Sequence, residues 1–169
     1  MKTNKIFISI VAIVVVLGGI WFFNNNEKKV VISDYKDAEY LIEGQKVKLG
    51  SGDSKYFGNE LKTDLDGDGD EDVVFLMTMD LGGSGTFFYV VAAIKTGDGY
   101  VGSDGYLLGD RIAPQTTEVS RNPRHKYVIV VNYADRALGE PMTARPSFGK
   151  SAYLKLDTNT MQWGIVEPN

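Results

Sequence analysis

Five aspartates alternate with other residues across a nine-residue stretch, and their spacing could hold a metal ion. Calcium takes about six to eight oxygen ligands in flexible geometry, and glycines between acidic residues let a backbone curl around the ion. The stretch therefore predicts a Ca²⁺ site, to which Asp70 would also offer its backbone carbonyl. The candidate ligands are Asp64, Asp66, Asp68, Asp70 and Asp72.

The spacing follows the opening of an EF-hand loop, but the rest of that motif is missing. An EF-hand needs a bidentate glutamate at its twelfth position and a helix on either side. The twelfth residue here is Phe75, inside an apolar run from 73 to 77. The sequence therefore excludes an EF-hand and predicts a loop that leads directly into a strand.

The loop resembles the calcium-binding loops of FG-GAP (integrin-type) repeats, in which an aspartate loop also precedes a strand. A propeller needs several repeats at a fixed period, whereas this loop occurs once, so the resemblance implies the loop and not the propeller. The alternative is a solvated acidic turn, because Asp-Gly pairs favour tight turns without any metal. Mutual repulsion of five aspartates within nine residues favours the calcium site over that alternative.

The amino-terminal segment predicts a membrane anchor. Ile6 to Phe23 is a run of 18 uncharged residues. As a helix it would reach roughly 27 Å, close to the roughly 30 Å hydrocarbon core of a bilayer. It lacks a small-residue cleavage site, which predicts an uncleaved signal anchor over residues 1–23. Lys2 and Lys5 favour a cytoplasmic amino terminus, which would place the rest of the chain outside the cytoplasm.

The remaining chain divides into a polar tether at 24–36 and one extracytoplasmic domain at 37–169. From Val30 onward it holds 21 acidic and 14 basic residues, so phosphate repulsion excludes nucleic acid as a favoured partner. Cysteine is absent. An exported domain without disulfides must be stabilised by packing alone or by packing and a bound ion.

Short apolar runs separated by Gly, Asp and Asn predict a single, mainly antiparallel β domain, either a sandwich or an open barrel. Nearly continuous apolar runs are typical of central strands that are covered on both faces. No long helical period occurs beyond the anchor. The segments are a hairpin at 40–42 and 45–49, a loop at 50–58, central strands at 73–79, 86–94 and 128–131, and a hairpin at 152–156 and 161–165.

Other polar segments favour structural roles. The glycine-rich segment 82–86 lacks the Gly-Lys-Ser/Thr ending of a phosphate loop and predicts a flexible connection. Arg111 and Arg136 each follow an aspartate, which favours structural ion pairs over a substrate clamp. The proline-containing segment 139–149 predicts either an ordered loop packed on the sheet or a recognition surface.

Catalysis finds little support in the sequence. The one histidine, His125, lies in a basic turn that predicts a solvated side chain, and no cysteine, H-E-x-x-H or G-x-S-x-G motif is present. The sequence therefore favours a non-catalytic binding or envelope-associated module. The alternative is a cell-wall or polysaccharide hydrolase that uses carboxylates. A sugar cleft lined by Tyr100, Tyr106 or Tyr133 would fit either function.

More than half of the chain resembles a family of uncharacterised bacterial exported proteins, many of them lipoproteins. The resemblance implies a cell-envelope setting, periplasmic or on the cell surface, and it implies no activity. For a binding module in that setting we expect an envelope polysaccharide or protein as partner. This chain has no cysteine to acylate, so its anchor would be the helix itself. The matching segments are 56–60, 64–72, 82–87, 108–115 and 132–147.

Overall fold

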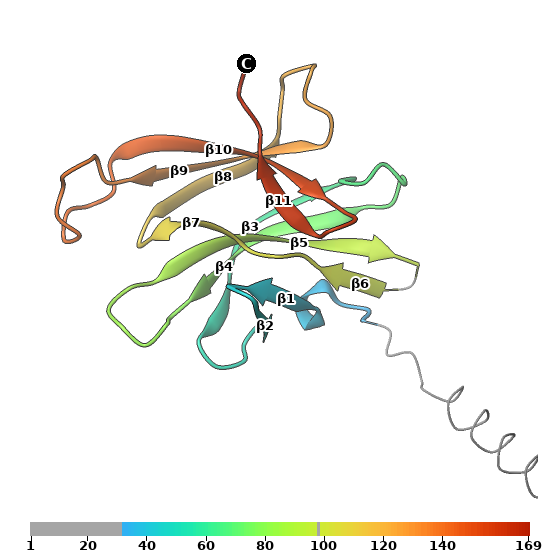
Figure 1. The fold of residues 1–169 in the computed structure, drawn as a ribbon, viewed down its shortest axis with the longest axis horizontal. Helices are drawn as coiled ribbons and strands as arrows, with labels where there is room; N and C mark the ends of the chain where they lie inside the picture. Colours follow the sequence, from blue (N-terminus) through green and yellow to red (C-terminus); the bar gives the residue numbers. More distant parts are fainter. Residues whose placement is uncertain (1–31, 98) are drawn as a thin grey trace, which may run out of the picture. The chain divides into compact units, whose positions relative to one another are not determined.

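The computed structural model describes residues 32–97 and 99–169 (Figure 1). The predicted anchor and most of the predicted tether lie outside these residues. Within the described ranges, no helix is both long enough and apolar enough to cross a membrane. The described residues belong to one compact unit.

The described chain is mainly β, as the sequence predicts. All paired strands run antiparallel. The elements are a short 3-10 helix η1 (Tyr35–Asp37) and the strands β1 (Glu39–Ile42), β2 (Gln45–Lys48), β3 (Ser54–Thr63), β4 (Asp72–Met79), β5 (Phe87–Thr96), β6 (Gly99–Gly102), β7 (Tyr106–Asp110), β8 (Ala113–Val119), β9 (Val128–Asp135), β10 (Phe148–Asp157) and β11 (Gln162–Ile165).

The strands form two large sheets and one small sheet. One large sheet has the order β3-β4-β5-β6, and β7 also pairs with β5. The other has the order β11-β10-β9-β8, and β1 pairs with β2 alone. Figure 1 shows the sheet of β8 to β11 stacked over the sheet of β3 to β7, with β1 and β2 on the opposite side. The sheets are stacked in layers, and the described strands do not close into a barrel.

Strands β4 and β5 are buried on both faces and divide the interior into two cores. The inner core lies between the two large sheets and includes Leu76 and Ile129. The outer core lies between β4, β5 and the small sheet, and includes Tyr40 and Met77. Because successive side chains of a strand point to opposite faces, β4 must be apolar at nearly every position to fill both cores. This double burial explains the continuous apolar run that identifies the strand in the sequence.

Several predicted elements are confirmed, and one predicted loop is wrong. The hairpins of β1 with β2 and of β10 with β11 form where expected, as do the central strands β4, β5 and β9. The predicted loop 50–58 is instead interrupted by β3, which begins at Ser54. This strand carries many exposed residues and two register irregularities around Gly58, so it shows no regular alternation. Ile32 and Tyr35, within the predicted tether, pack against the outer core.

The two aspartate-arginine pairs differ in structure. Arg111 forms the expected ion pair, with Nη2 at 2.8 Å from Oδ2 of Asp110. Arg136 does not pair with a carboxylate, because its guanidinium donates to backbone carbonyls, including that of Ala144 at 2.9 Å. It thereby holds the proline-containing loop against the sheet. Its neighbour Asp135 pairs with a lysine instead.

Candidate metal centre

The aspartate loop connects the end of β3 to the start of β4. Gly67 and Gly69 adopt φ values of +87° and +91°, a left-handed conformation that glycine reaches without steric cost. Asp72 is the first residue of β4 and is fully buried. The loop is therefore a tight, glycine-dependent turn whose last aspartate is fixed inside the domain.

Local hydrogen bonds shape the exposed part of the loop. The carboxylate of Asp64 accepts from the backbone N–H of Gly67, and that of Asp66 accepts from the N–H of Asp68 at 3.1 Å. Asp68 accepts from the N–H of Asp70 at 2.8 Å. Short acidic side chains favour such turns because they bond to backbone groups two or three residues further on. The repeated aspartates thus stabilise the conformation of the turn and also give it its negative charge.

Asp72 connects the loop to the neighbouring strand. Its Oδ2 accepts from the N–H of Leu65 at 2.8 Å, and its Oδ1 accepts from the N–H of Lys95 at 2.8 Å. Burial raises the pKa of the Asp72 carboxyl, and the nearby charges of Asp66 and Asp68 raise that pKa further. The two backbone hydrogen bonds oppose this rise. A nearby cation would therefore favour the charged form of the buried Asp72 carboxyl.

Three of the five predicted ligands come together. Asp64, Asp66 and Asp72 each present a carboxylate oxygen, and these oxygens lie within 4.8 Å of one another. We refer to these residues as the three-carboxylate cluster. Asp68 and Asp70 lie outside the cluster, with exposed side chains. Among the described residues, no lysine or arginine forms an ion pair with the cluster.

The donor set suits a hard cation. Carboxylate oxygens are the ligands that calcium prefers, and a cluster without a basic partner has charge that a divalent ion could neutralise. Three carboxylates supply fewer than the roughly six to eight oxygens that calcium takes. Backbone carbonyls of the loop and water would have to complete the shell. The residues present therefore fit calcium, with Asp64, Asp66 and Asp72 as its carboxylate ligands.

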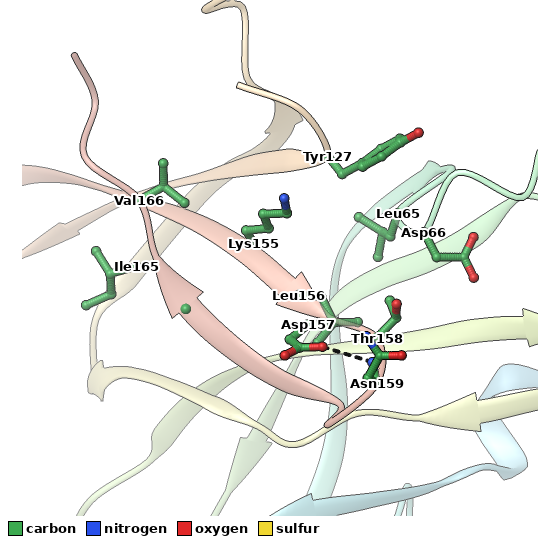
Figure 2. Close-up of a pocket in the computed structure, with 11 residues that line it drawn as sticks. Leu65, Asp66, Tyr127, Lys155, Leu156, Asp157, Thr158, Asn159, Ile165 and Val166 are labelled. Atoms are coloured by element: carbon green, nitrogen blue, oxygen red, sulfur yellow. Dashed lines mark hydrogen bonds between the residues drawn. The ribbon is translucent and has the colours of Figure 1, made fainter. Parts of the chain in front are cut away.

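A cavity of about 570 Å³ borders the loop, and sequence reasoning missed it. Leu65 and Asp66 line one side, and residues of the β10-β11 hairpin line the other (Figure 2). Tyr127 also lines the cavity, and its ring lies against Gly67, so that a Cβ at Gly67 would be 2.3 Å from the tyrosine hydroxyl. Tyr127 has a φ of +57°, which no sequence pattern around it signals.

The other residues that the sequence singled out do not form a second site. His125 is half-buried rather than solvated: its Nδ1 lies 2.7 Å from the Ser120 hydroxyl oxygen and its Nε2 lies 3.0 Å from the Glu167 carbonyl oxygen. These contacts hold the last residues of the chain against the sheet. Tyr106 and Tyr133 pack on the inner core, whereas Tyr100 packs on the outer core. The three tyrosines therefore do not line one sugar cleft.

Comparisons with protein-family models, with curated proteins and with solved structures find no match. The fold and the loop define a mainly antiparallel β domain with a candidate cation site at the β3-β4 connection. The resemblances to FG-GAP loops and to bacterial exported proteins stay predictions.

Proposed function

We propose that this protein is a membrane-anchored, extracytoplasmic calcium-binding module with a non-catalytic binding role in the cell envelope. The observation that carries the proposal is the buried Asp72 carboxylate, which converges with Asp64 and Asp66 within 4.8 Å. Two backbone hydrogen bonds offset part of the cost of burying this carboxylate, but among the described residues no opposite charge pairs with it. A cation bound here would neutralise that charge and fix the loop between β3 and β4.

The calcium site has a structural consequence for the domain. Asp72 bonds to Leu65 at the start of the loop and to Lys95 near the end of β5. An ion on Asp72 would therefore stabilise the loop and the β4-β5 pair together. A ligand that binds only the folded state adds about 2.7 kcal/mol of stability at 100 times its Kd.

Thermal unfolding of the full chain in detergent tests the metal site. We expect calcium in place of chelator to raise the Tm by several degrees, since about 1 kcal/mol shifts the Tm of such a chain by roughly 2–4 °C. Asp66→Asn should abolish the rise, whereas Asp70→Asn should retain it. The two variants remove the same charge from the same loop, but Asp70 lies outside the three-carboxylate cluster.

Two results would contradict the metal site. One is an unchanged Tm at millimolar calcium. The other is an equal loss of the calcium effect in Asp66→Asn and Asp70→Asn, which would mean that calcium only screens the charge of the loop. Magnesium in place of calcium tests selectivity, because magnesium demands near-octahedral geometry and gives up its waters reluctantly.

The anchored, extracytoplasmic placement is supported by the uncharged segment from Ile6 to Phe23 and by Lys2 and Lys5 on its amino-terminal side. Protease added to spheroplasts, whose outer membrane is opened and whose inner membrane is intact, tests it in bacteria that express the full chain. We expect the domain to be degraded while a cytoplasmic control protein survives. A domain that is protected until the inner membrane is lysed would refute the placement.

A further inference from the structure

The cavity beside the aspartate loop has the size and position of a ligand site. Its volume of about 570 Å³ falls within the roughly 300–1,000 Å³ range of small-molecule sites. Figure 2 shows Leu65 lying between Tyr127 and Leu156, and Lys155 reaching from β10 toward Tyr127. The cavity is formed where the aspartate loop, the residue before β9 and the β10-β11 hairpin meet.

The lining combines apolar surface with several kinds of hydrogen-bonding group. Leu65 and Leu156 are buried side chains that line the cavity. Asp157 ends β10, and Thr158 and Asn159 begin the turn that follows; they offer a carboxylate, a hydroxyl and an amide. The backbone N–H of Asn159 donates to Oδ1 of Asp157 at 2.9 Å, which fixes the shape of this turn.

Tyr127 provides an aromatic surface. The ammonium group of Lys126 lies 4.9 Å from the centroid of its ring, and the residue still lines the cavity. An aromatic ring beside carboxylate, amide and hydroxyl groups matches a sugar, which has C–H faces that pack on rings and hydroxyls that both donate and accept hydrogen bonds. Asp157 and Lys155 bring one charge of each sign to the lining, so a neutral sugar fits better than an anionic one.

We infer that this cavity binds a short, neutral saccharide segment of a glycan, packed on Tyr127 and hydrogen-bonded by Asp157 and Asn159. The inference deepens the proposed function by naming a ligand class and its place. Only the dependence of sugar binding on calcium rests on the proposed metal site.

The aspartate loop sets the position of one wall of the cavity. Leu65 lines the cavity and donates its N–H to the cluster residue Asp72. Gly67 lies against the ring of Tyr127. In Figure 2 the carboxylate of Asp66 points away from the hairpin, so a cation bound to Asp66 would lie outside the cavity, on the far side of this wall. Calcium would fix this wall before the sugar binds, and preorganisation of this kind increases affinity.

Calorimetric titration of the full chain, in a detergent without a sugar headgroup, tests the inference. The probes are N,N′-diacetylchitobiose, cellobiose and maltose, each with calcium and with chelator. We expect at least one disaccharide to bind, with at least threefold higher affinity in calcium. Tyr127→Ala should weaken that binding at least tenfold, and Tyr127→Phe should restore it to within threefold, because the ring and not the hydroxyl makes the contact.

Matched variants separate the cavity from general effects on folding. Asn159→Ala should weaken binding at least threefold while keeping the backbone bond to Asp157. Phe148→Ala removes a 56% exposed aromatic residue at the other end of β10 and should leave binding unchanged. The calcium-dependent Tm of each variant reports whether its loop is intact, so a misfolded variant is recognised independently of sugar binding.

The inference is overturned if none of the three disaccharides binds at 10 mM, or if neither Tyr127→Ala nor Asn159→Ala weakens binding. Asp66→Asn distinguishes the two proposals. If this variant loses its calcium-dependent Tm rise but still binds sugar with the affinity measured in chelator, both proposals are supported. If sugar binds equally with and without calcium although calcium raises the Tm, the metal site stands and its link to the cavity is refuted.

Discussion

Gly67 is the residue at which the aspartate loop and Tyr127 meet. Its φ of +87° is unfavourable for other residues, and an added Cβ would lie 2.3 Å from the tyrosine hydroxyl oxygen. Gly69 has a similar φ of +91° but open space around the position of a Cβ. Replacing either glycine therefore costs free energy because the backbone φ is positive. Only at Gly67 would the new side chain also clash with another residue.

We expect Gly67→Ala to lower the free energy of unfolding by more than Gly69→Ala. A non-glycine residue at positive φ costs about 1–3 kcal/mol, and displacement of Tyr127 adds to this cost at Gly67 alone. Urea denaturation of both variants without calcium measures the difference. Equal losses would show that Tyr127 does not constrain the loop.

Glu60 gives the outer surface of β3 a pH-dependent interaction. Its carboxylate accepts hydrogen bonds from the hydroxyls of Tyr35 and Tyr56. The bond from Tyr35 lowers the pKa of Glu60 most, burial opposes it, and the bond from Tyr56 lowers the pKa further. Because the folded pKa lies below the unfolded one, the interaction stabilises the fold above the unfolded pKa of about 4.3 and is lost as pH falls through the folded pKa.

Glu60→Gln should therefore destabilise the domain at pH 7, by less than about 1 kcal/mol because the site is near the surface, and should have almost no effect at pH 3. The glutamine resembles the protonated acid, so the wild type converges on the variant as the pH falls. Urea unfolding at the two pH values measures this. An equal loss of unfolding free energy at pH 7 and pH 3 would contradict a role for the Glu60 charge. Tyr35→Phe should lower the unfolding free energy by less in Glu60→Gln than in the wild type.

At the scale of elements, the small sheet is joined to the large sheet by backbone contacts. Leu41 donates its N–H to the carbonyl of Ser103 at 3.1 Å and accepts from the N–H of Gly105 at 2.8 Å. Gly102 lies so close that a Cβ there would be 2.2 Å from the carbonyl oxygen of Glu39. The contact between β1 and the end of β6 therefore requires a glycine, which has no side chain, at position 102.

Gly102→Ala should displace β1 and expose these backbone hydrogen bonds. We expect faster hydrogen exchange at the amides of Leu41 and Gly105 and a loss of about 1–3 kcal/mol in unfolding free energy, as for other overpacked positions. Gly83→Ala is the matched control, because a Cβ at Gly83 meets no atom within 4 Å. Unchanged exchange at Leu41 would show that the small sheet tolerates the displacement.

The sequence predicts the strands whose side chains must be apolar and the two hairpins, and it misses other strands whose burial is partial. Continuous runs reveal β4, β5 and β9 because both faces of these strands are covered. β3 and β8 contain many exposed polar residues, and Gly58 and Pro114 lie beside their irregularities, so alternation is lost. At the site, aspartate spacing predicts the loop, but only the fold selects Asp64, Asp66 and Asp72 and places Tyr127 beside them.

At the scale of the whole molecule, β4 belongs to both cores. Leu76 points into the inner core and Met77 into the outer core, and both are 0% exposed. Neighbouring residues on one strand therefore connect the two layers of packing. Loosening either side of β4 should weaken the other, so the domain should unfold as one unit.

Leu76→Ala and Met77→Ala should each lower the unfolding free energy by about 2–5 kcal/mol, the range for large buried side chains. In each variant, NMR signals of Leu154 in the inner core and Tyr40 in the outer core should disappear at the same urea concentration. Separate midpoints would show that the two cores are independent cooperative units.

The outer strands also determine how copies of this domain meet one another at high concentration. A long, regular edge strand can recruit a strand of a second molecule, and repetition of that step produces fibres. Here β3 carries two register irregularities, β8 has Pro114 beside another, and β6 and β11 are four residues long. The irregularities of β3 and β8, which also conceal these two strands in the sequence, and the shortness of β6 and β11 thus deprive a neighbouring copy of a straight template, which disfavours amyloid-like growth.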